Sequence, residues 1–143
     1  MEELISMLRE GQHSLVVANG RTCTFGGRGV SDLYRLLRQE PALLRGALVA
    51  DKVVGKAAAA LMALAGVKEV YAEVVSRPAL RLLEDAGLQI GCGTVVPHII
   101  NRAKTGMCPL ETRCLNLQTP GECLAQIEEF MNEGRRQDMP GLQ

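Results

Sequence analysis

The alternation of strand and helix patterns between residues 46 and 96 constrains the fold of this chain more than any other feature. Three apolar runs have the length of buried strands, and two helical patterns separate them. The predicted strands are at 46–50, 67–75 and 88–96, and the predicted helices are at 52–65 and 77–86. Strand–helix–strand units of this kind join parallel strands through right-handed crossovers and place helices on the faces of the sheet. This half of the chain therefore predicts an α/β fold.

The first 40 residues add an antiparallel edge to the predicted sheet. Apolar runs at 14–18 and 21–25 flank Asn19-Gly20, which is a strong hairpin signal. Helical patterns at 2–10 and 32–39 surround this hairpin, and a last helix at 119–133 begins with the capping box of Thr119 and Glu122. No stretch has the composition of a domain linker. We therefore expect one domain over 1–134, a three-layer α/β/α sandwich with a mixed sheet, and a frayed tail at 135–143.

Charge and hydropathy exclude several classes of function. The 16 Lys and Arg balance the 16 Asp and Glu, whereas proteins that grip nucleic-acid phosphates usually carry a basic excess. No apolar run approaches the roughly 20 residues of a membrane span, so no membrane partner is expected. The five cysteines are an odd number, and the N-terminus does not read as a signal peptide. Free thiols in a cytoplasmic protein are the expectation.

The stretch "ADKVVGKAAAALMALAG" at 50–66 carries the first candidate site. Asp51 stands where a helix N-cap is expected, and Lys52 and Lys56 are spaced to share one helix face. Cations near a helix N-terminus are disfavoured by the helix dipole, by roughly 0.3–1 kcal/mol each, and Gly55 would let another group come close. The pattern predicts an anion site where the strand passes into the helix. The alternative is that both lysines reach solvent and that Asp51 is only a cap.

The segment from 101 to 114 carries the second candidate site. It gathers polar and small residues in an irregular stretch, and such loops are often functional. Thr105-Gly106 resembles a backbone nest for an anion, and Pro109 is suited to begin a short helix. The candidate ligand-binding residues are Asn101, Arg102, Thr105, Gly106, Cys108 and Glu111. The alternative is an ordinary surface loop.

The cysteines and histidines do not predict a metal site. Cys108 and Cys114 have five residues between them, more than a structural zinc site uses, and His13 and His98 fit no ligand pattern. We therefore expect neither a metal nor another cofactor. Cys108 would be an activated nucleophile if it lay at a helix N-terminus beside Arg102. A buried or unreactive thiol is the alternative.

The order of the predicted elements resembles the cytidine deaminase-like fold. In that fold, zinc ligands and a catalytic glutamate open two successive helices, and the resemblance places those positions at 51–53 and 78–82. Pro78 matches, but Asp51, Ala79 and Leu82 stand where zinc ligands would be. The strings "DKVVGKAAA" and "NRAKTGMCPLE" are similar to a small bacterial and archaeal family of unknown function that has this fold without zinc ligands, and the likeness spans roughly 2–134.

The combined expectation is a protein that binds a small anionic ligand, a nucleotide or a phosphorylated metabolite, without zinc. The ligand would contact Asp51, Lys52 and Lys56 together with the 101–111 loop. A metal-independent enzyme that uses Lys52 or Lys56 as a base or electrophile, and Cys108 as a nucleophile, is the first alternative. An interaction module is the second. Deaminase-like domains often associate, so the analogy also implies a homodimer.

Overall fold

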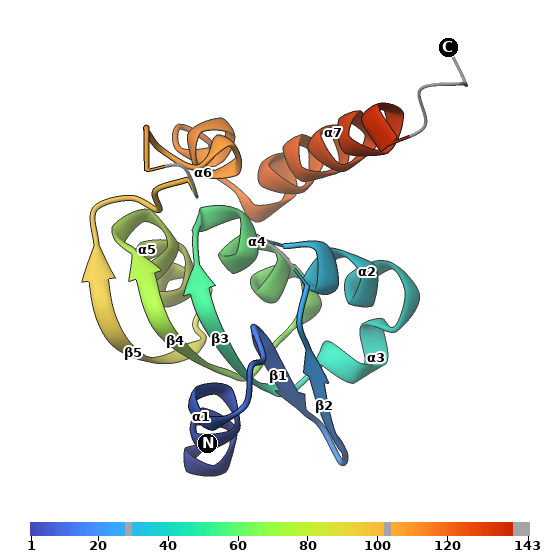
Figure 1. The fold of residues 1–143 in the computed structure, drawn as a ribbon, viewed down its shortest axis with the longest axis vertical. Helices are drawn as coiled ribbons and strands as arrows, with labels where there is room; N and C mark the ends of the chain where they lie inside the picture. Colours follow the sequence, from blue (N-terminus) through green and yellow to red (C-terminus); the bar gives the residue numbers. More distant parts are fainter. Residues whose placement is uncertain (28–29, 102–103, 139–143) are drawn as a thin grey trace.

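The computed structural model describes residues 1–27, 30–101 and 104–138. Within these ranges, five strands form one sheet in the order β2-β1-β3-β4-β5 (Figure 1). Strands β3, β4 and β5 are parallel, and β1 is antiparallel to both β2 and β3. The predicted mixed sheet is confirmed. The strands are β1 (Leu15–Ala18), β2 (Thr22–Phe25), β3 (Leu48–Val54), β4 (Glu69–Ser76) and β5 (Gln89–Val96).

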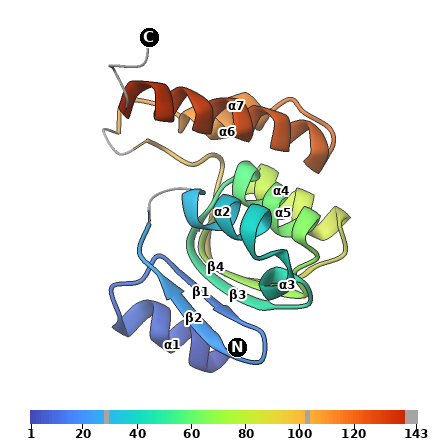
Figure 2. The ribbon, with the colours of Figure 1, turned by 90° about the vertical axis from the view of Figure 1, so that its right-hand side faces the viewer.

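Helices lie against both faces of the sheet, but unequally. On one face, α1 packs Leu4 and Leu8 against Val16, Ala50 and Tyr71. The larger core lies on the other face, beneath α2, α4 and α5, while α6 and α7 pack against α4 beyond the carboxyl ends of the strands (Figures 1 and 2). The helices are α1 (Glu2–Glu10), α2 (Ser31–Gln39), α3 (Pro41–Leu44), α4 (Lys56–Ala65), α5 (Arg77–Asp85), α6 (Pro109–Cys114) and α7 (Pro120–Asp138).

Helix α4 is the central helix of the larger core. Every residue from Ala57 to Met62 is buried, as its uninterrupted apolar sequence predicts. Its alanines allow α5 and α7 to pack closely on either side. The helix ends at Gly66, whose φ of 76° is the left-handed conformation that glycine adopts most readily. The predicted burial of this helix is confirmed.

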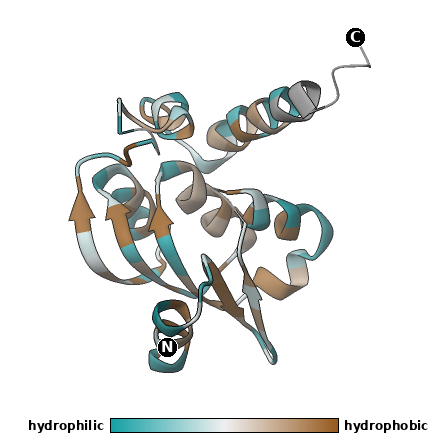
Figure 3. Ribbon diagram, in the orientation of Figure 1, coloured by the Kyte–Doolittle hydropathy of each residue, from teal (hydrophilic) through white to brown (hydrophobic). Residues whose placement is uncertain are grey.

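The boundary between β3 and α4 differs from the prediction. Strand β3 continues to Val54, and α4 begins at Lys56, with Gly55 as an extended N-cap residue. Val53 and Val54 pair with Val74 and Val75 of β4, and Figure 3 shows the adjacent hydrophobic carboxyl ends of β3, β4 and β5. Valine favours a pleated strand, and pairing with a parallel neighbour overrides the helical reading of this segment.

Other local predictions agree with the structure. Gly20 has a φ of 78° in the β1–β2 hairpin. The Thr119 hydroxyl accepts the Glu122 N–H at 3.2 Å, and the Glu122 carboxylate accepts the Thr119 N–H at 3.0 Å.

Helix α7 continues to Asp138, beyond the predicted end at 133, and the short α3 was not predicted. Among the described residues, no helix has the length and apolar content needed to cross a membrane.

Candidate functional site

The Glu111 carboxylate fills the N-terminus of α4. Its side chain is 1% exposed although it comes from the short helix α6. Oε1 accepts the Lys56 backbone N–H at 2.8 Å and the Ser76 hydroxyl at 3.2 Å, and Oε2 accepts the Ile99 N–H at 2.7 Å. A carboxylate at a helix N-terminus is stabilised by the free N–H groups and the dipole. The predicted anion-binding position is therefore occupied by the protein's own anion.

Gly55 is the point of close approach that the sequence predicted, but the approaching groups belong to this chain. A Cβ at Gly55 would lie 3.2 Å from Ile99 Cγ1 and 3.4 Å from Glu111 Oε2. The Ile99 side chain would have to move by a few tenths of an ångström to admit a methyl group, whereas the Glu111 contact would be of ordinary length. The glycine therefore lets the Ile99 side chain pack closely against the start of α4, beside the Glu111 carboxylate.

The Lys56 side chain binds the segment that follows α6. Its Nζ donates to the carbonyl oxygens of Leu115 at 3.1 Å and Leu117 at 2.6 Å. A cation in this position satisfies carbonyls that follow the last turn of a helix. The role of Lys56 in binding an anionic ligand stays a prediction, and the structure gives its ammonium group another role, which is to hold the connection between α6 and α7 to the start of α4.

Asp51 and Lys52 lie in β3, not in a helix, so Asp51 is no helix cap and Lys52 shares no helix face with Lys56. Asp51 is 8% exposed, and burial raises the pKa of its carboxyl to about 7, helped by the nearby charge of Asp32 and opposed by the N–H groups of Val53 and Lys52. Lys52 is exposed and lines a hollow of about 260 Å³ beside Arg9. The structure thus places Lys52 toward α1, apart from the Lys56 contacts.

Asn101 is joined to Thr105 and Gly106 by local hydrogen bonds. Asn101 Nδ2 donates to Thr105 Oγ1 at 3.1 Å, and the Thr105 N–H donates back to Asn101 Oδ1 at the same distance. The Asn101 N–H also donates to the Gly106 carbonyl at 2.9 Å. Because the Thr105 N–H already has an acceptor, the predicted nest for an anion is not open. Arg102, another predicted ligand-binding residue, lies outside the described residues.

Cys108 occupies the position before α6 and is partly buried. Its N–H donates to the Ile99 carbonyl at 2.8 Å, so it helps to hold the start of α6 near Glu111. The other two thiols of this region, Cys114 and Cys123, are fully buried. A hydrogen bond between them, together with burial, raises the pKa of Cys114, and the same contact lowers the pKa of Cys123.

A groove of about 980 Å³ lies between α5 and the connection from α6 to α7. Its cationic members on α5, Arg77 and Arg81, are one helical turn apart and exposed. His98 also lines it, and His98 Nδ1 is buried with no hydrogen-bond partner among the described residues. The charged residues and the histidine that line the groove are Lys56, Arg77, Arg81, Glu84, Asp85 and His98.

The sequence reading missed Arg77 and Arg81 because they resemble the solvated face of an ordinary amphipathic helix. The available signal was their position. They open the helix that follows a parallel strand, at the edge of the sheet where open α/β folds bind ligands. Ser76, which ends β4, accepts the Ala79 N–H at 3.3 Å and caps this helix.

Among the described residues, no group of three or more His, Cys, Asp or Glu could hold a metal ion.

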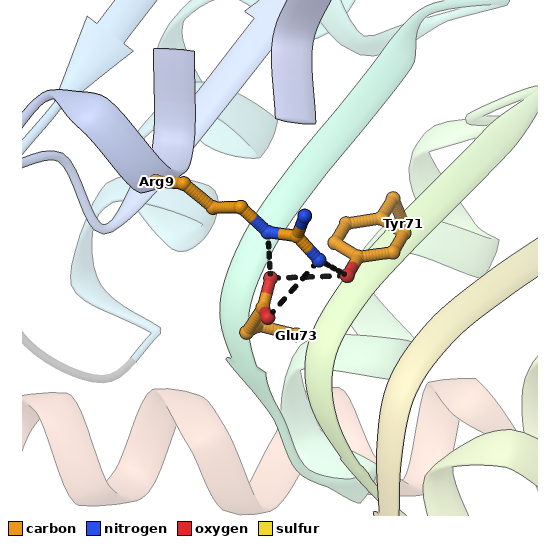
Figure 4. A network of polar contacts seen from close by, with 3 residues as sticks. All are labelled: Arg9, Tyr71 and Glu73. Atoms are coloured by element: carbon orange, nitrogen blue, oxygen red, sulfur yellow. Dashed lines mark hydrogen bonds and ion pairs between the residues drawn. The ribbon is translucent and has the colours of Figure 1, made fainter. Parts of the chain in front are cut away.

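A polar network joins α1 to β4 on the opposite face of the sheet (Figure 4). Arg9 donates to the Tyr71 hydroxyl at 2.8 Å and to Glu73 Oε2 at 3.2 Å, and the Tyr71 hydroxyl donates to Glu73 Oε2 at 3.0 Å. The hydrogen bond from Arg9 lowers the pKa of Glu73. This cluster lies beside Lys52 and is separate from the groove.

The fold and site define an α/β domain with a mixed five-stranded sheet, an internally filled helix N-terminus and a charged groove beside it. The chain belongs to the family described as Domain of unknown function (DUF1893), which matches residues 3–131. It is similar to the crystal structure of a DUF1893 family protein (TM1506) from Thermotoga maritima. The two are 26% identical, with a TM-score of 0.83 over 90% of this chain and 87% of that one. No curated protein matches the chain.

Proposed function

We propose that this protein binds a small anionic ligand, a nucleotide or a phosphorylated metabolite, in the groove beside α5. The observation that carries the proposal is the groove itself, whose volume of about 980 Å³ lies at the upper end of the range for ligand sites. Arg77 and Arg81 supply two guanidinium groups on successive turns at the start of α5. Guanidinium groups match the oxygens of phosphate in charge and geometry.

The two ends of the groove differ in charge. Arg77 and Arg81 lie at the start of α5, whereas Glu84 and Asp85 lie at its end. A phosphate at the first end leaves the carboxylates for donors such as ribose hydroxyl or base amino groups. His98 Nδ1 adds an unsatisfied polar atom, which is uncommon in a folded interior and would be satisfied by a polar group of the ligand. This arrangement favours a nucleotide over inorganic phosphate.

The proposal moves the ligand away from the residues that the sequence first indicated. The Glu111 carboxylate already accepts the N–H at the start of α4, and the Lys56 ammonium already donates to two carbonyl groups. Lys56 therefore forms part of the wall of the groove, and the anion is left to the arginines. The same commitment of Lys56 weakens the alternative of a metal-independent enzyme, because a charged ammonium bonded to carbonyls is not available as a base.

The scaffold that we propose is the three-layer α/β/α arrangement of the cytidine deaminase-like fold. Its support is the order of elements and the placement of α1 opposite α2, α4 and α5. The positions that deaminases use for zinc are Asp51, Ala79 and Leu82 here, and two of these side chains cannot bind a metal. Binding without zinc-dependent deamination follows from those residue types.

Thermal unfolding in the presence of adenosine monophosphate, ribose 5-phosphate and inorganic phosphate tests the proposal. A ligand that binds only the folded state at 100 times its Kd stabilises the protein by about 2.7 kcal/mol. We expect the wild type to respond to the nucleotide or the sugar phosphate and an Arg77→Ala/Arg81→Ala variant to lose the response. Lys52→Ala, outside the groove, is the control that should keep it. A wild type that responds to none of these compounds would contradict the proposal.

A further inference from the structure

The outer edge of β5 has no neighbouring strand among the described residues. The strand pairs with β4 alone, and Figure 1 shows β5 as the outermost strand with no other element beyond it. All of its residues except Ile90 and Val96 are exposed. A free strand edge presents a row of backbone N–H and C=O groups that can pair with another chain.

The sequence of β5, "QIGCGTVV", contains none of the usual protections of a free edge. It has eight residues and neither a charged residue nor a proline. The opposite edge of the sheet, β2, is only four residues long and follows Arg21. Natural edge strands are typically kept from pairing by short length, charges, prolines or a covering element. The composition of β5 is that of a strand that is paired in solution.

We propose that β5 pairs antiparallel with β5 of a second copy of this chain, about a two-fold axis perpendicular to the sheet. The two five-stranded sheets would then form one continuous sheet, and the two free edges would satisfy each other. An uncharged strand brings no like charges opposite each other when it meets its own copy.

Helix α5 indicates where the two-fold axis passes. Ser76, the N-cap of α5, pairs with Val96, so the helix begins level with the end of β5. Its nine residues cover roughly 13 Å at about 1.5 Å each, the length of about four strand residues at about 3.3 Å each. The middle of α5 is therefore level with Thr94, and an axis near Thr94 sets the two copies of α5 side by side and antiparallel.

The charges of α5 complement those of its copy in this arrangement. The exposed face is basic at the start, with Arg77 and Arg81, and acidic at the end, with Glu84 and Asp85. Because the axis reverses the second helix, the basic end of each helix lies beside the acidic end of the other, so no like-charged ends meet while Arg77 and Arg81 still line the groove that we propose for the anion. Such complementarity fixes the orientation and register of an interface more than it adds affinity. A second copy of this chain supplies the complementary charges without any change of sequence.

The mass of the full chain in solution, by light scattering, tests the proposal. We expect the wild type at twice 15.4 kDa, Thr94→Lys at the monomer mass, and Thr24→Lys, an exposed change on β2, still at the dimer mass. Circular dichroism shows whether the variants are folded. A monomeric wild type, a wild type larger than a dimer, or a folded Thr94→Lys variant that remains dimeric would overturn the proposal.

The register is tested by cross-linking under mild oxidation with diamide, which does not depend on the lysine variant. In a Cys92→Ser background, Thr94→Cys should form a disulfide-linked dimer. Over the same time the wild type, whose only thiol on this strand is that of Cys92, should form at least several-fold less disulfide-linked dimer. The axis near Thr94 brings the two engineered thiols opposite each other and moves Cys92 away from its copy. Equal or faster linking through Cys92 would overturn that axis.

Discussion

The Glu111 carboxylate lies 2.8 Å from the backbone nitrogen of Lys56, and this contact joins α6 to the first residue of α4. The same residue, Lys56, donates its ammonium protons to the chain that follows α6. One residue thus contributes its backbone to an acidic partner and its side chain to carbonyl groups. These contacts leave the start of α4 without a vacancy for an external anion.

Replacing Glu111 with alanine should destabilise the protein by about 3 kcal/mol or more. Three donors, on Lys56, Ser76 and Ile99, would lose their acceptor in a buried place, and each unsatisfied group costs about 1–3 kcal/mol unless water reaches it. Chemical denaturation at neutral pH measures the loss. Thr112→Ala, at an exposed position of the same helix, is the matched control. A Glu111→Ala variant within 1 kcal/mol of that control would show that the carboxylate is not needed there.

The two lysines of the β3–α4 region should differ sharply when each is changed to methionine. Lys56→Met removes two charge-assisted hydrogen bonds to carbonyl oxygens, and we expect a loss of about 2–3 kcal/mol. Lys52→Met changes an exposed side chain and should alter stability by less than about 0.5 kcal/mol. Urea unfolding of the pair measures the difference. Equal effects would refute the assignment of Lys56 to the connection between α6 and α7.

The contrast between these lysines shows what the sequence could and could not predict. The strands, the crossovers, the buried α4 and the capping box of α7 follow from local patterns, and the structure contains them. The boundary at Gly55 does not, because pairing of Val53 and Val54 with β4 decides it. The partners of Lys56 lie 55 to 61 residues further along the chain. No local pattern records a contact over that separation.

Asp51 should make the stability fall as the pH rises from about 4 to about 7. Burial raises the pKa of its carboxyl in the folded protein to about 7, from an ordinary value of 3.8. The folded state therefore binds the proton more tightly than the unfolded state, and its advantage is complete below pH 4 and lost above pH 7. Asp51→Asn should lack this dependence, so its stability relative to the wild type should rise by up to about 1.4 kcal/mol per pH unit in that range.

Urea unfolding at several pH values between 4 and 8 checks this expectation. The informative quantity is the difference between the wild type and Asp51→Asn, because other groups titrate in both proteins. Asp85→Asn removes an exposed carboxylate and is the control. Parallel curves for the wild type and Asp51→Asn would mean that the buried carboxyl does not titrate in this range.

Gly93 should tolerate a methyl group far less well than Gly91 on the same strand. A Cβ at Gly93 would lie 2.7 Å from the Glu73 carbonyl oxygen and 3.3 Å from the Tyr71 hydroxyl, within the network that holds Arg9. At Gly91 the nearest atom, Tyr71 Cδ2, would be 3.7 Å away, an ordinary contact. Forced overpacking typically costs about 1–3 kcal/mol. We expect Gly93→Ala to lower Tm by several degrees more than Gly91→Ala, and similar values would refute the steric argument.

The internal filling of the α4 N-terminus also has a consequence for synthesis of the chain. The acceptor of the Lys56 amide, Glu111, is added 55 residues later, and the carbonyl groups that accept from its ammonium, those of Leu115 and Leu117, are added later still. At about 5–20 residues per second, the ribosome needs roughly 3–11 seconds to add 55 residues. During that interval the nascent strands and α4 can assemble only with this helix end facing water. Completion of the fold therefore depends on translation reaching α6.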